Sequence, residues 1–287
     1  MSEYKVILFY KFINLRNPKK VMAEQKALAA KCNLKGRMLI AEEGINATFE
    51  GLARDVAKYK RELKKDKRFN DIVFKESDGD GTGFTKLKIK VRPEVVTLGV
   101  GKLNIKKDTA KTVTASELEK MYKKSEDFVI LDLRNDFEVK AGYFDKTVNP
   151  ELGNFRDLPA KLKVLKKLPE LKDKKVVTVC TGGIRCEKAT ALMKQEGFKN
   201  LYQLKDGIHT YMAKYPASHF KGSLFVFDNR LITPVVETKK REVVGECIYC
   251  GKKSEDFYND DRIRPSRKVI VCRKCVPQYA QVLRKCI

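Results

Sequence analysis

The sequence predicts an α/β protein with two folded domains and a basic, cysteine-rich tail. Three observations support this prediction. Short apolar runs alternate with helical periodicity in residues 1–92; the alternation resumes after residue 113 with more apolar strands; and paired cysteines replace any periodicity from Glu246. A chain of 287 residues is long enough for two cores. We expect domains at 1–92 and 113–222, a linker at 93–112 and a basic C-terminal region at 223–287.

The first domain alternates between strand and helix patterns. Pro18 favours the start of a helix, and Leu52, Val56, Tyr59 and Leu63 recur at helical spacing in a second one. The polar, glycine-rich stretch 77–83 is expected to be a loop. A β-α-β-β-α-β order follows, which predicts a ferredoxin-like α+β sandwich. We place its strands at 5–12, 38–41, 44–51, 72–74 and 87–91.

The second domain has the pattern of a parallel sheet covered on both faces. Thr114-Ala-Ser-Glu117 has the form of a capping box, in which the hydroxyl and the carboxylate each accept a hydrogen bond from a free amide at a helix start. Continuously apolar, β-rich runs then occur at 129–133, 176–179 and 201–204, separated by helical patterns. We therefore expect an α/β domain here.

Charge and cysteine content limit the function classes. The chain has 61 Lys and Arg against 37 Asp and Glu, a net charge of +24 that favours a polyanionic partner. It has no run of about 18 apolar residues and no export signal, so we expect no membrane insertion and a cytoplasmic location. Its eight cysteines are then read as thiols, metal ligands or nucleophiles rather than as a disulfide framework.

The most informative segment joins an apolar strand to a helix through a cysteine loop. Val176-Val-Thr-Val179 runs directly into Cys180, and Gly182 and Gly183 allow a backbone that can present several amides to one atom. Amides at a helix start, together with the cation of Arg185, favour a thiolate over a thiol and would hold a second anion beside it. We therefore predict that Cys180 is a nucleophile of low pKa.

Three stretches together resemble a rhodanese domain. They are Cys-Thr-Gly-Gly-Ile-Arg-Cys-Glu-Lys-Ala at 180–189, Leu-Asp-Leu-Arg-Asn-Asp-Phe-Glu at 131–138 and Leu-Lys-Asp-Gly-Ile at 204–208. With Ala-Glu-Glu-Gly-Ile-Asn-Ala-Thr at 41–48 and the downstream cysteine pairs, the chain resembles, nearly end to end, the rhodanese-related tRNA uridine hydroxylases. Gly142-Tyr-Phe-Asp145 departs from the Gly-His-Ile of ordinary rhodaneses.

The resemblance implies a tRNA-modifying oxidoreductase that forms 5-hydroxyuridine at the wobble position, with molecular oxygen as co-substrate and tRNA as partner. Carried over by position, the catalytic role falls on Cys180. Asp132 and Arg134 are expected to brace the loop rather than touch the substrate. Cys186 is either a resolving thiol or a core-facing cysteine at the helix start. The active-site loop comprises Thr181, Gly182, Gly183, Ile184, Arg185 and Cys186.

Two other functions remain open. The chain could be a sulfurtransferase that passes a persulfide from Cys180 to an acceptor thiol, or a non-catalytic RNA-binding adaptor. The sequence lacks a histidine-rich metal cluster, a dinucleotide-binding glycine motif and a Walker loop, so we expect no iron, haem, flavin or nucleotide cofactor. Nothing in the sequence indicates a protein partner.

The C-terminal cysteines have the spacing of a metal site. Cys247-Ile-Tyr-Cys250 and Cys272-Arg-Lys-Cys275 are two C-x-x-C pairs with 21 residues between them. Each pair can bind one side of a tetrahedral ion, and four thiolates suit zinc. We predict a structural zinc site with all four positions filled by protein.

A basic segment surrounds the second cysteine pair. Residues 262–287 contain eight Lys or Arg and no Asp or Glu. A segment of this kind, held rigid by a metal, would suit an RNA phosphate backbone. The predicted RNA contacts are Arg262, Arg264, Arg267, Lys268, Arg273 and Lys274.

Overall fold

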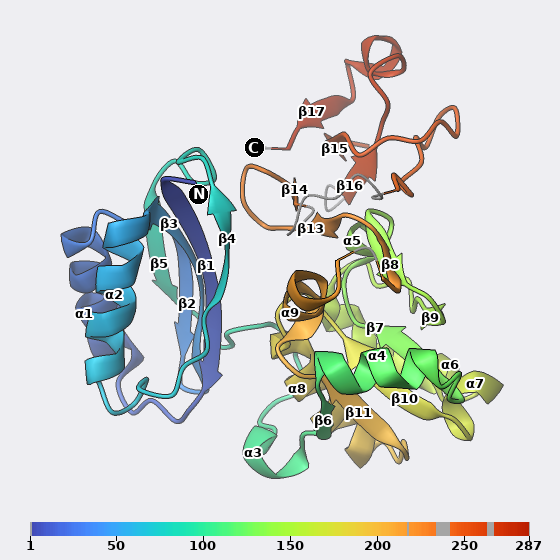
Figure 1. Cartoon of the computed structure of the whole chain (residues 1–287), viewed down its shortest axis with the longest axis horizontal. Helices are drawn as coiled ribbons and strands as arrows, with labels where there is room; N and C mark the ends of the chain where they lie inside the picture. Colours follow the sequence, from blue (N-terminus) through green and yellow to red (C-terminus); the bar gives the residue numbers. More distant parts are fainter. Residues whose placement is uncertain (1, 217, 234–241, 263–266, 287) are drawn as a thin grey trace. The chain divides into compact units, whose positions relative to one another are not determined.

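The computed structural model divides into two compact units, residues 1–97 and 98–287. It describes residues 2–216, 218–233, 242–262 and 267–286. Figure 1 shows the helices and strands of each unit. In the described residues, no helix is both long and apolar enough to cross a membrane.

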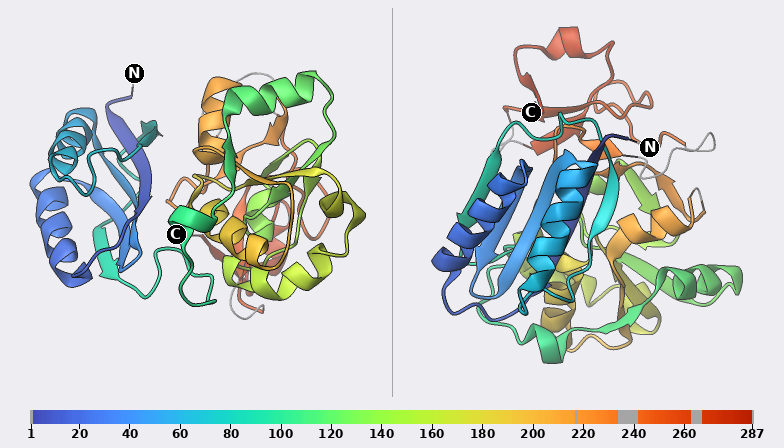
Figure 2. Two further views of the ribbon diagram at one scale, coloured as in Figure 1. Left: turned by 90° about the horizontal axis from the view of Figure 1, so that it is seen from below. Right: turned by 60° about the vertical axis from the view of Figure 1, so that its left-hand side comes forward.

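The N-terminal unit is a five-stranded sheet with both helices on one face (Figures 1 and 2). The strand order is β4-β1-β3-β2-β5, with β5 parallel to β2 and the other neighbours antiparallel. Ile7, Phe9 and Phe49 from the sheet pack with Val21, Val56 and Tyr59 from the helices. This confirms the predicted sandwich. Its elements are β1 (Tyr4–Phe12), α1 (Pro18–Lys31), β2 (Lys35–Ala41), β3 (Gly44–Leu52), α2 (Ala53–Lys65), β4 (Lys75–Gly79) and β5 (Leu87–Val91).

One strand prediction in this unit is wrong. Residues 72–74 are not a strand: Ile72 is buried in the core as irregular chain, and β4 instead occupies the start of the predicted loop at 77–83. The polar sequence of β4 has low strand propensity, but pairing with β1 satisfies its backbone, with Tyr4 opposite Gly79. Of the apolar run 72–74, Ile72 is buried, whereas Val73 is exposed, so the run indicated neither a strand nor uniform burial.

The C-terminal unit contains the predicted parallel sheet, in the order β6-β11-β10-β7-β9. Its first α/β part contains β6 (Lys111–Val113), α4 (Ala115–Lys123), β7 (Phe128–Asp132), α5 (Asp136–Val139), β8 (Gly142–Phe144), β9 (Thr147–Val148), η1 (Phe155–Asp157), α6 (Leu158–Leu165), α7 (Pro169–Lys172), β10 (Lys175–Val179), α8 (Ile184–Gln195), β11 (Leu201–Leu204), α9 (Gly207–Lys214) and β12 (Phe220–Gly222). Helices cover both faces of the sheet (Figure 2).

Local sequence signals explain where these elements begin. Thr114 and Glu117 form the expected capping box at the start of α4: the amide of Glu117 donates to Thr114 Oγ1 (3.2 Å) and the amide of Thr114 to Glu117 Oε2 (2.7 Å). The segment predicted as a linker, 93–112, contains α3 (Ile105–Asp108) and the first residues of β6, which pairs with β11. A three-residue strand leaves too little periodicity in the sequence to be recognised.

The rest of the C-terminal unit has little regular structure. A small sheet, β16-β15-β17, follows the hairpin of β13 and β14. Phe257 and Ile270 from this sheet pack with Ala141 and Phe225, and Phe137 of α5 lies against the same cluster. The tail is therefore part of the same core as α5. The elements are β13 (Leu224–Phe225), β14 (Ile232–Thr233), β15 (Phe257–Asp260), β16 (Arg267–Ile270), η2 (Val276–Tyr279) and β17 (Leu283–Lys285).

Candidate active site

Cys180 lies at the carboxyl end of β10, the middle strand of the parallel sheet. Gly183 has a φ of +102°, a conformation that L side chains rarely adopt, and the helix α8 begins immediately after it. This turn brings the Gly183 amide to 3.2 Å from Cys180 Sγ, where it donates a hydrogen bond. The structure thus forms the amide-lined loop that the two glycines predicted.

The surroundings of Cys180 favour its thiolate. Burial acts to raise the pKa of Cys180, but hydrogen bonds from Cys186, the charge of Arg185 and the amides of Gly183 and Cys186 outweigh it and lower the pKa to about 5. Burial and the neighbouring Cys180 thiolate raise the pKa of Cys186, so this second thiol keeps its proton. Both cysteines are fully buried. Cys186 therefore faces the core and also interacts with Cys180, and a resolving role for its thiol stays a prediction.

Arg185 is held by a carboxylate that the sequence analysis did not single out. Arg185 Nη1 donates to Glu138 Oε2 at 2.7 Å and Nη2 to Glu138 Oε1 at 2.8 Å. The same Nη2 is 3.2 Å from the hydroxyl of Thr181. Glu138 is completely buried, so this is a two-pronged ion pair inside the protein. Glu138 is the last residue of the 131–138 motif. The signal available in the sequence was an acidic residue at this position of the motif.

The charge of Arg185 is balanced by an internal carboxylate. Glu138 accepts one hydrogen bond from each terminal nitrogen of Arg185. The binding of a second anion beside Cys180 stays a prediction. Burial acts to lower the pKa of Arg185, but the charge and hydrogen bonds of Glu138 raise it well above its usual value, and the guanidinium stays charged. Arg185 acts on Cys180 as a fixed charge.

Asp132 and Arg134 support the segment that carries Glu138. Their ion pair is fully buried, with Arg134 Nη2 2.6 Å from Asp132 Oδ2. Arg134 also donates to the carbonyl oxygens of Glu138 (3.2 Å) and Gly142 (2.6 Å). The pair thus fixes the segment that presents Glu138, which in turn holds Arg185.

The start of α9 supports the loop from the other side. The amide of Ile208 donates to Cys180 O (3.0 Å), and the amide of His209 donates to Thr181 O (3.1 Å). Gly207 has a φ of +73°, and a Cβ there would lie 2.7 Å from Cys180 O. This close approach explains the glycine in the 204–208 motif. Of the loop residues, Gly182 is buried, whereas Thr181 and Ile184 are half-buried.

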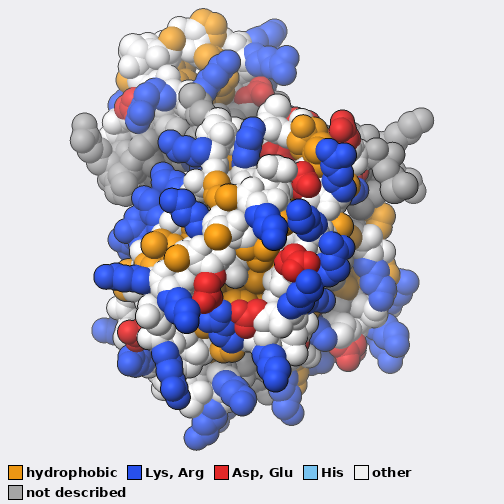
Figure 3. Space-filling model, turned by 90° about the vertical axis from the view of Figure 1, so that its left-hand side faces the viewer, with side chains coloured by type: hydrophobic (Ala, Val, Ile, Leu, Met, Phe, Trp, Pro, Cys, Tyr) orange, Lys and Arg blue, Asp and Glu red, His pale blue; other side chains and the backbone are white. Residues whose placement is uncertain are grey.

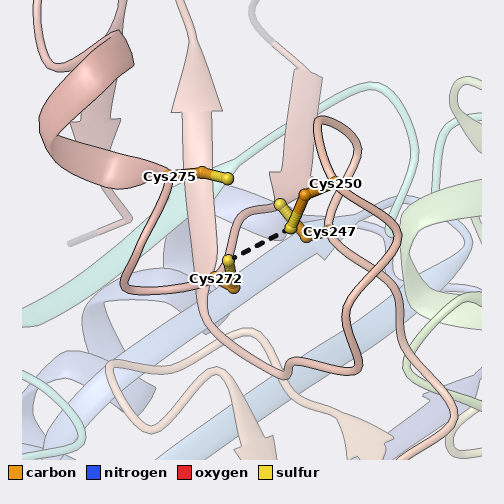
Figure 4. A group of neighbouring side chains, drawn as sticks. All are labelled: Cys247, Cys250, Cys272 and Cys275. Atoms are coloured by element: carbon orange, nitrogen blue, oxygen red, sulfur yellow. Dashed lines mark hydrogen bonds between the residues drawn. The ribbon is translucent and has the colours of Figure 1, made fainter.

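The four C-terminal cysteines come together as their spacing predicted. The sulfur atoms of Cys247, Cys250, Cys272 and Cys275 lie within 4.8 Å of one another, and their side chains converge (Figure 4). A tetrahedral zinc ion with Zn–S bonds of about 2.3 Å would separate its sulfurs by about 3.8 Å. The 3.5 Å between the sulfurs of Cys250 and Cys272 is close to this value.

The thiol chemistry also suits a cation. Burial acts to raise the pKa of Cys247, but backbone amides donate to its sulfur and lower it to about 6. Burial and hydrogen bonds to the other three sulfurs raise the pKa of Cys275 to about 12. The cluster therefore cannot hold four thiolates on its own, and a bound dication would replace the shared protons. The residues present fit a metal.

Two of the predicted RNA contacts have carboxylate partners, although their own side chains are exposed. Arg262 pairs with Asp260 at 2.6 Å and donates to the hydroxyl of Tyr249 at 2.7 Å, and Arg273 lies 3.7 Å from Asp256. Lys268 is half-buried, and Lys274 is exposed. Arg264 lies outside the described residues, and Arg267 begins β16.

Comparison with known families agrees with this architecture. Residues 4–95 match the UPF0176 acylphosphatase like domain, residues 114–214 the rhodanese-like domain and residues 221–287 the domain described as rhodanase C-terminal. Among solved structures, a rhodanese-related protein from Thermoplasma volcanium is 25% identical, over 37% of this chain and 93% of that chain, with a TM-score of 0.31.

Curated relatives match almost the whole chain. Proteins named tRNA uridine(34) hydroxylase are 37% identical over 94% of this chain in Onion yellows phytoplasma and 36% identical over 99% in Bacillus cereus strain Q1, covering 87% and 88% of those proteins. A relative of the same name in Cytophaga hutchinsonii is 34% identical over 96% of this chain and 86% of its own. With this identity along nearly its full length, the chain belongs to the tRNA uridine(34) hydroxylase family.

Proposed function

We propose that this protein hydroxylates uridine 34 of tRNA to 5-hydroxyuridine, with Cys180 as the catalytic nucleophile. The observation that supports it best is a thiolate of pKa about 5, fixed between amides and a charged arginine, in a chain whose full-length relatives are named for this reaction. The location we propose is the cytoplasm, where tRNA is used.

The chemistry needs an activated C5 position on the uracil ring. Addition of the Cys180 thiolate to C6 would place electron density on C5, which can then react with an oxidant. With molecular oxygen as oxidant, one oxygen atom enters the C5–H bond and the other leaves as water. The balance requires two electrons and two protons from an external two-electron reductant. Loss of the thiolate from C6 then restores the uracil ring.

Access to the thiolate is a condition of this proposal. Cys180 has no exposed surface, whereas Thr181 and Ile184 of the same loop are half-buried. A uridine extruded from its stack could reach the sulfur only after the residues that cover it move. The amides and Arg185 that already favour the thiolate would then act on a substrate in direct contact with it.

We further propose that the four cysteines bind zinc as a structural ion. Zinc bound by four thiolates has no open coordination position, so its role would be to stabilise the C-terminal region rather than to activate oxygen. The residues that would hold it are Cys247, Cys250, Cys272 and Cys275.

Persulfide transfer is the second candidate function, because a low-pKa cysteine in a rhodanese-like loop is what it requires. The ion pair with Glu138 disfavours a dianionic donor such as thiosulfate, since the carboxylate already balances the charge of Arg185. A non-catalytic adaptor has no need for a depressed cysteine pKa.

The deciding experiment is mass spectrometry of tRNA nucleosides from cells that lack the gene, complemented with wild type, Cys180→Ala or Cys32→Ala. Cys32 is also a fully buried cysteine, but it lies in the N-terminal unit and serves as a matched control. We expect wild type and Cys32→Ala to restore 5-hydroxyuridine and Cys180→Ala to fail. Restoration by Cys180→Ala would exclude the catalytic role, and thiosulfate turnover without any hydroxyuridine would favour sulfur transfer.

A further inference from the structure

The positive charge of the N-terminal unit is concentrated on its two helices. The helix segments 16–35 and 53–68 contain 14 Lys and Arg against four Asp and Glu. The other 61 residues of the unit contain eight Lys and Arg against nine Asp and Glu. The whole positive surplus of this unit therefore belongs to α1, α2 and their flanking residues, and the rest of the unit is close to neutral.

The basic side chains of the two helices and their adjoining turns share one face. Both helices pack on the same side of the sheet, and Figure 3 shows Lys and Arg spread over the face that carries them, with few carboxylates between them. We call this the helix face and define it by the basic residues of the two segments without Lys35, which begins β2 and alternates with the core-facing Met38. Ten of its 13 basic side chains are exposed. They are Arg16, Lys19, Lys20, Lys26, Lys31, Arg54, Arg61, Lys64, Lys65 and Lys67.

Most of these charges lack an internal partner. Within the part of the chain that the structure describes, ion pairs on the helix face involve only four of its basic residues, and the remaining nine have none within 4.0 Å. The four paired residues are Lys60, Arg61, Lys65 and Arg68. In the C-terminal tail, by contrast, Arg262, Arg273 and Arg284 all have carboxylate partners. The helix face thus has more charge available to an external anion.

The arrangement costs the folded unit some stability. In α2, Arg54 and Lys58, Lys60 and Lys64, and Arg61 and Lys65 are like charges at i, i+4 spacing. Each such pair destabilises a helix by about 0.2–0.5 kcal/mol. Substitution of one member would relieve the repulsion of its pair. Arg54, Arg61, Lys64 and Lys65 are exposed, whereas Lys58 and Lys60 are half-buried. Binding of a polyanion would offset the repulsion.

We propose that the helix face binds the phosphate backbone of the tRNA substrate. This inference rests on the proposed function and adds to it the surface that holds the substrate. Each helix presents several exposed cations, and contacts from such side chains to phosphates carry no base specificity. The helix face, rather than the predicted C-terminal residues, supplies the larger electrostatic share of tRNA affinity.

The test compares two variants of the full chain that lose the same charge from opposite faces of one sheet. The helix-face variant is K20Q/K26Q/R54Q/K64Q. The control is K86Q/K88Q/K90Q/R92Q, whose exposed side chains alternate along and beside β5 with the core-facing Leu87 and Ile89. The measurements are the tRNA dissociation constant as a function of salt, the melting temperature and the yield of 5-hydroxyuridine.

We expect the helix-face variant to bind tRNA about tenfold more weakly than wild type, with the slope of log affinity against log salt reduced by about 3. Its melting temperature should equal or exceed that of wild type, because like-charge pairs are removed, and saturating tRNA should restore turnover. The control should keep the wild-type slope. The proposal is wrong if the slope of log affinity against log salt is unchanged in the helix-face variant, or if it falls as much or more in the control. Failure of wild type to form 5-hydroxyuridine overturns the proposed function instead.

Discussion

Glu138 and Arg185 form a buried, two-pronged ion pair beside Cys180. The two N–O distances are 2.7 and 2.8 Å, although the residues lie 47 positions apart in the chain. Glu138 is itself fixed from behind by Arg134, which donates to its carbonyl oxygen. The charge that favours the Cys180 thiolate is therefore held in place by a chain of buried contacts that starts at Asp132.

Breaking this pair from either side should destabilise the protein strongly. Glu138→Gln or Arg185→Met leaves a buried charge without its partner, which costs about 3–5 kcal/mol of the free energy of unfolding. The double variant should lose less than the sum of the two single losses. Urea unfolding of the three variants measures this coupling. Lys60→Gln, which breaks a partly exposed pair with Glu76, should cost less than about 1 kcal/mol. Strictly additive losses would show that the two residues do not act together.

The thiolate of Cys180 should form with an apparent pKa of about 5. Above this pH the sulfur is deprotonated in the folded protein, and acidification through pH 5 should remove the thiolate absorbance near 240 nm. Arg185→Met and Cys186→Ala should each raise the pKa, because each removes a group that stabilises the anion. The signal is the difference between each protein and its Cys180→Ser counterpart. Cys32→Ala should leave it unchanged, since burial raises the pKa of that thiol. A midpoint near pH 9 would contradict the site geometry.

The purified protein should contain one tightly bound dication per chain. Cys247→Ser or Cys272→Ser should remove it and lower the melting temperature, because Cys247, Val271 and Cys272 share one small core with Leu283. Elemental analysis by mass spectrometry provides the measurement, and Cys32→Ala is the control for loss of a cysteine. Full metal content in the Cys247 or Cys272 variants would rule out the four-cysteine site.

Gly207→Ala should disturb the active-site loop far more than an equivalent change elsewhere. Its Cβ would lie 2.6 Å from Thr181 O and 2.7 Å from Cys180 O, on a backbone with φ +73°. Gly197→Ala is the matched control: its φ is +83°, but its nearest neighbour is the flexible end of Lys166 at 3.6 Å. Both should lose about 1–2 kcal/mol for the left-handed conformation. We expect only Gly207→Ala to lose hydroxylation beyond this, and equal activity of the two variants would show that the loop does not depend on this contact.

The sequence by itself determined the parts of this protein that depend on local spacing. Cys180, two glycines and Arg185 follow one another closely, so the turn from strand to helix already implied a thiolate among amides. The C-x-x-C pairs predicted the convergence of four sulfurs in the same way. Alternation of strand and helix patterns was enough for the sandwich and the parallel sheet, because the periodicity of long elements reports which side is buried.

Only the tertiary structure decided the contacts between distant segments. Glu138 and Arg185 are separated by 47 positions and meet because β7 and β10 are neighbours, which no spacing rule encodes. β4 exists because β1 offers it a partner, against the preference of its own residues. The sequence also did not show which charges have partners. The tail has the most conspicuous basic run, yet Arg262 and Arg284 pair with acidic residues in the folded protein. Most of the basic side chains of α1 and α2 are exposed to solvent. Sites built from neighbouring residues can be predicted from the sequence, whereas ion pairing between distant residues and the exposure of side chains depend on how the chain packs.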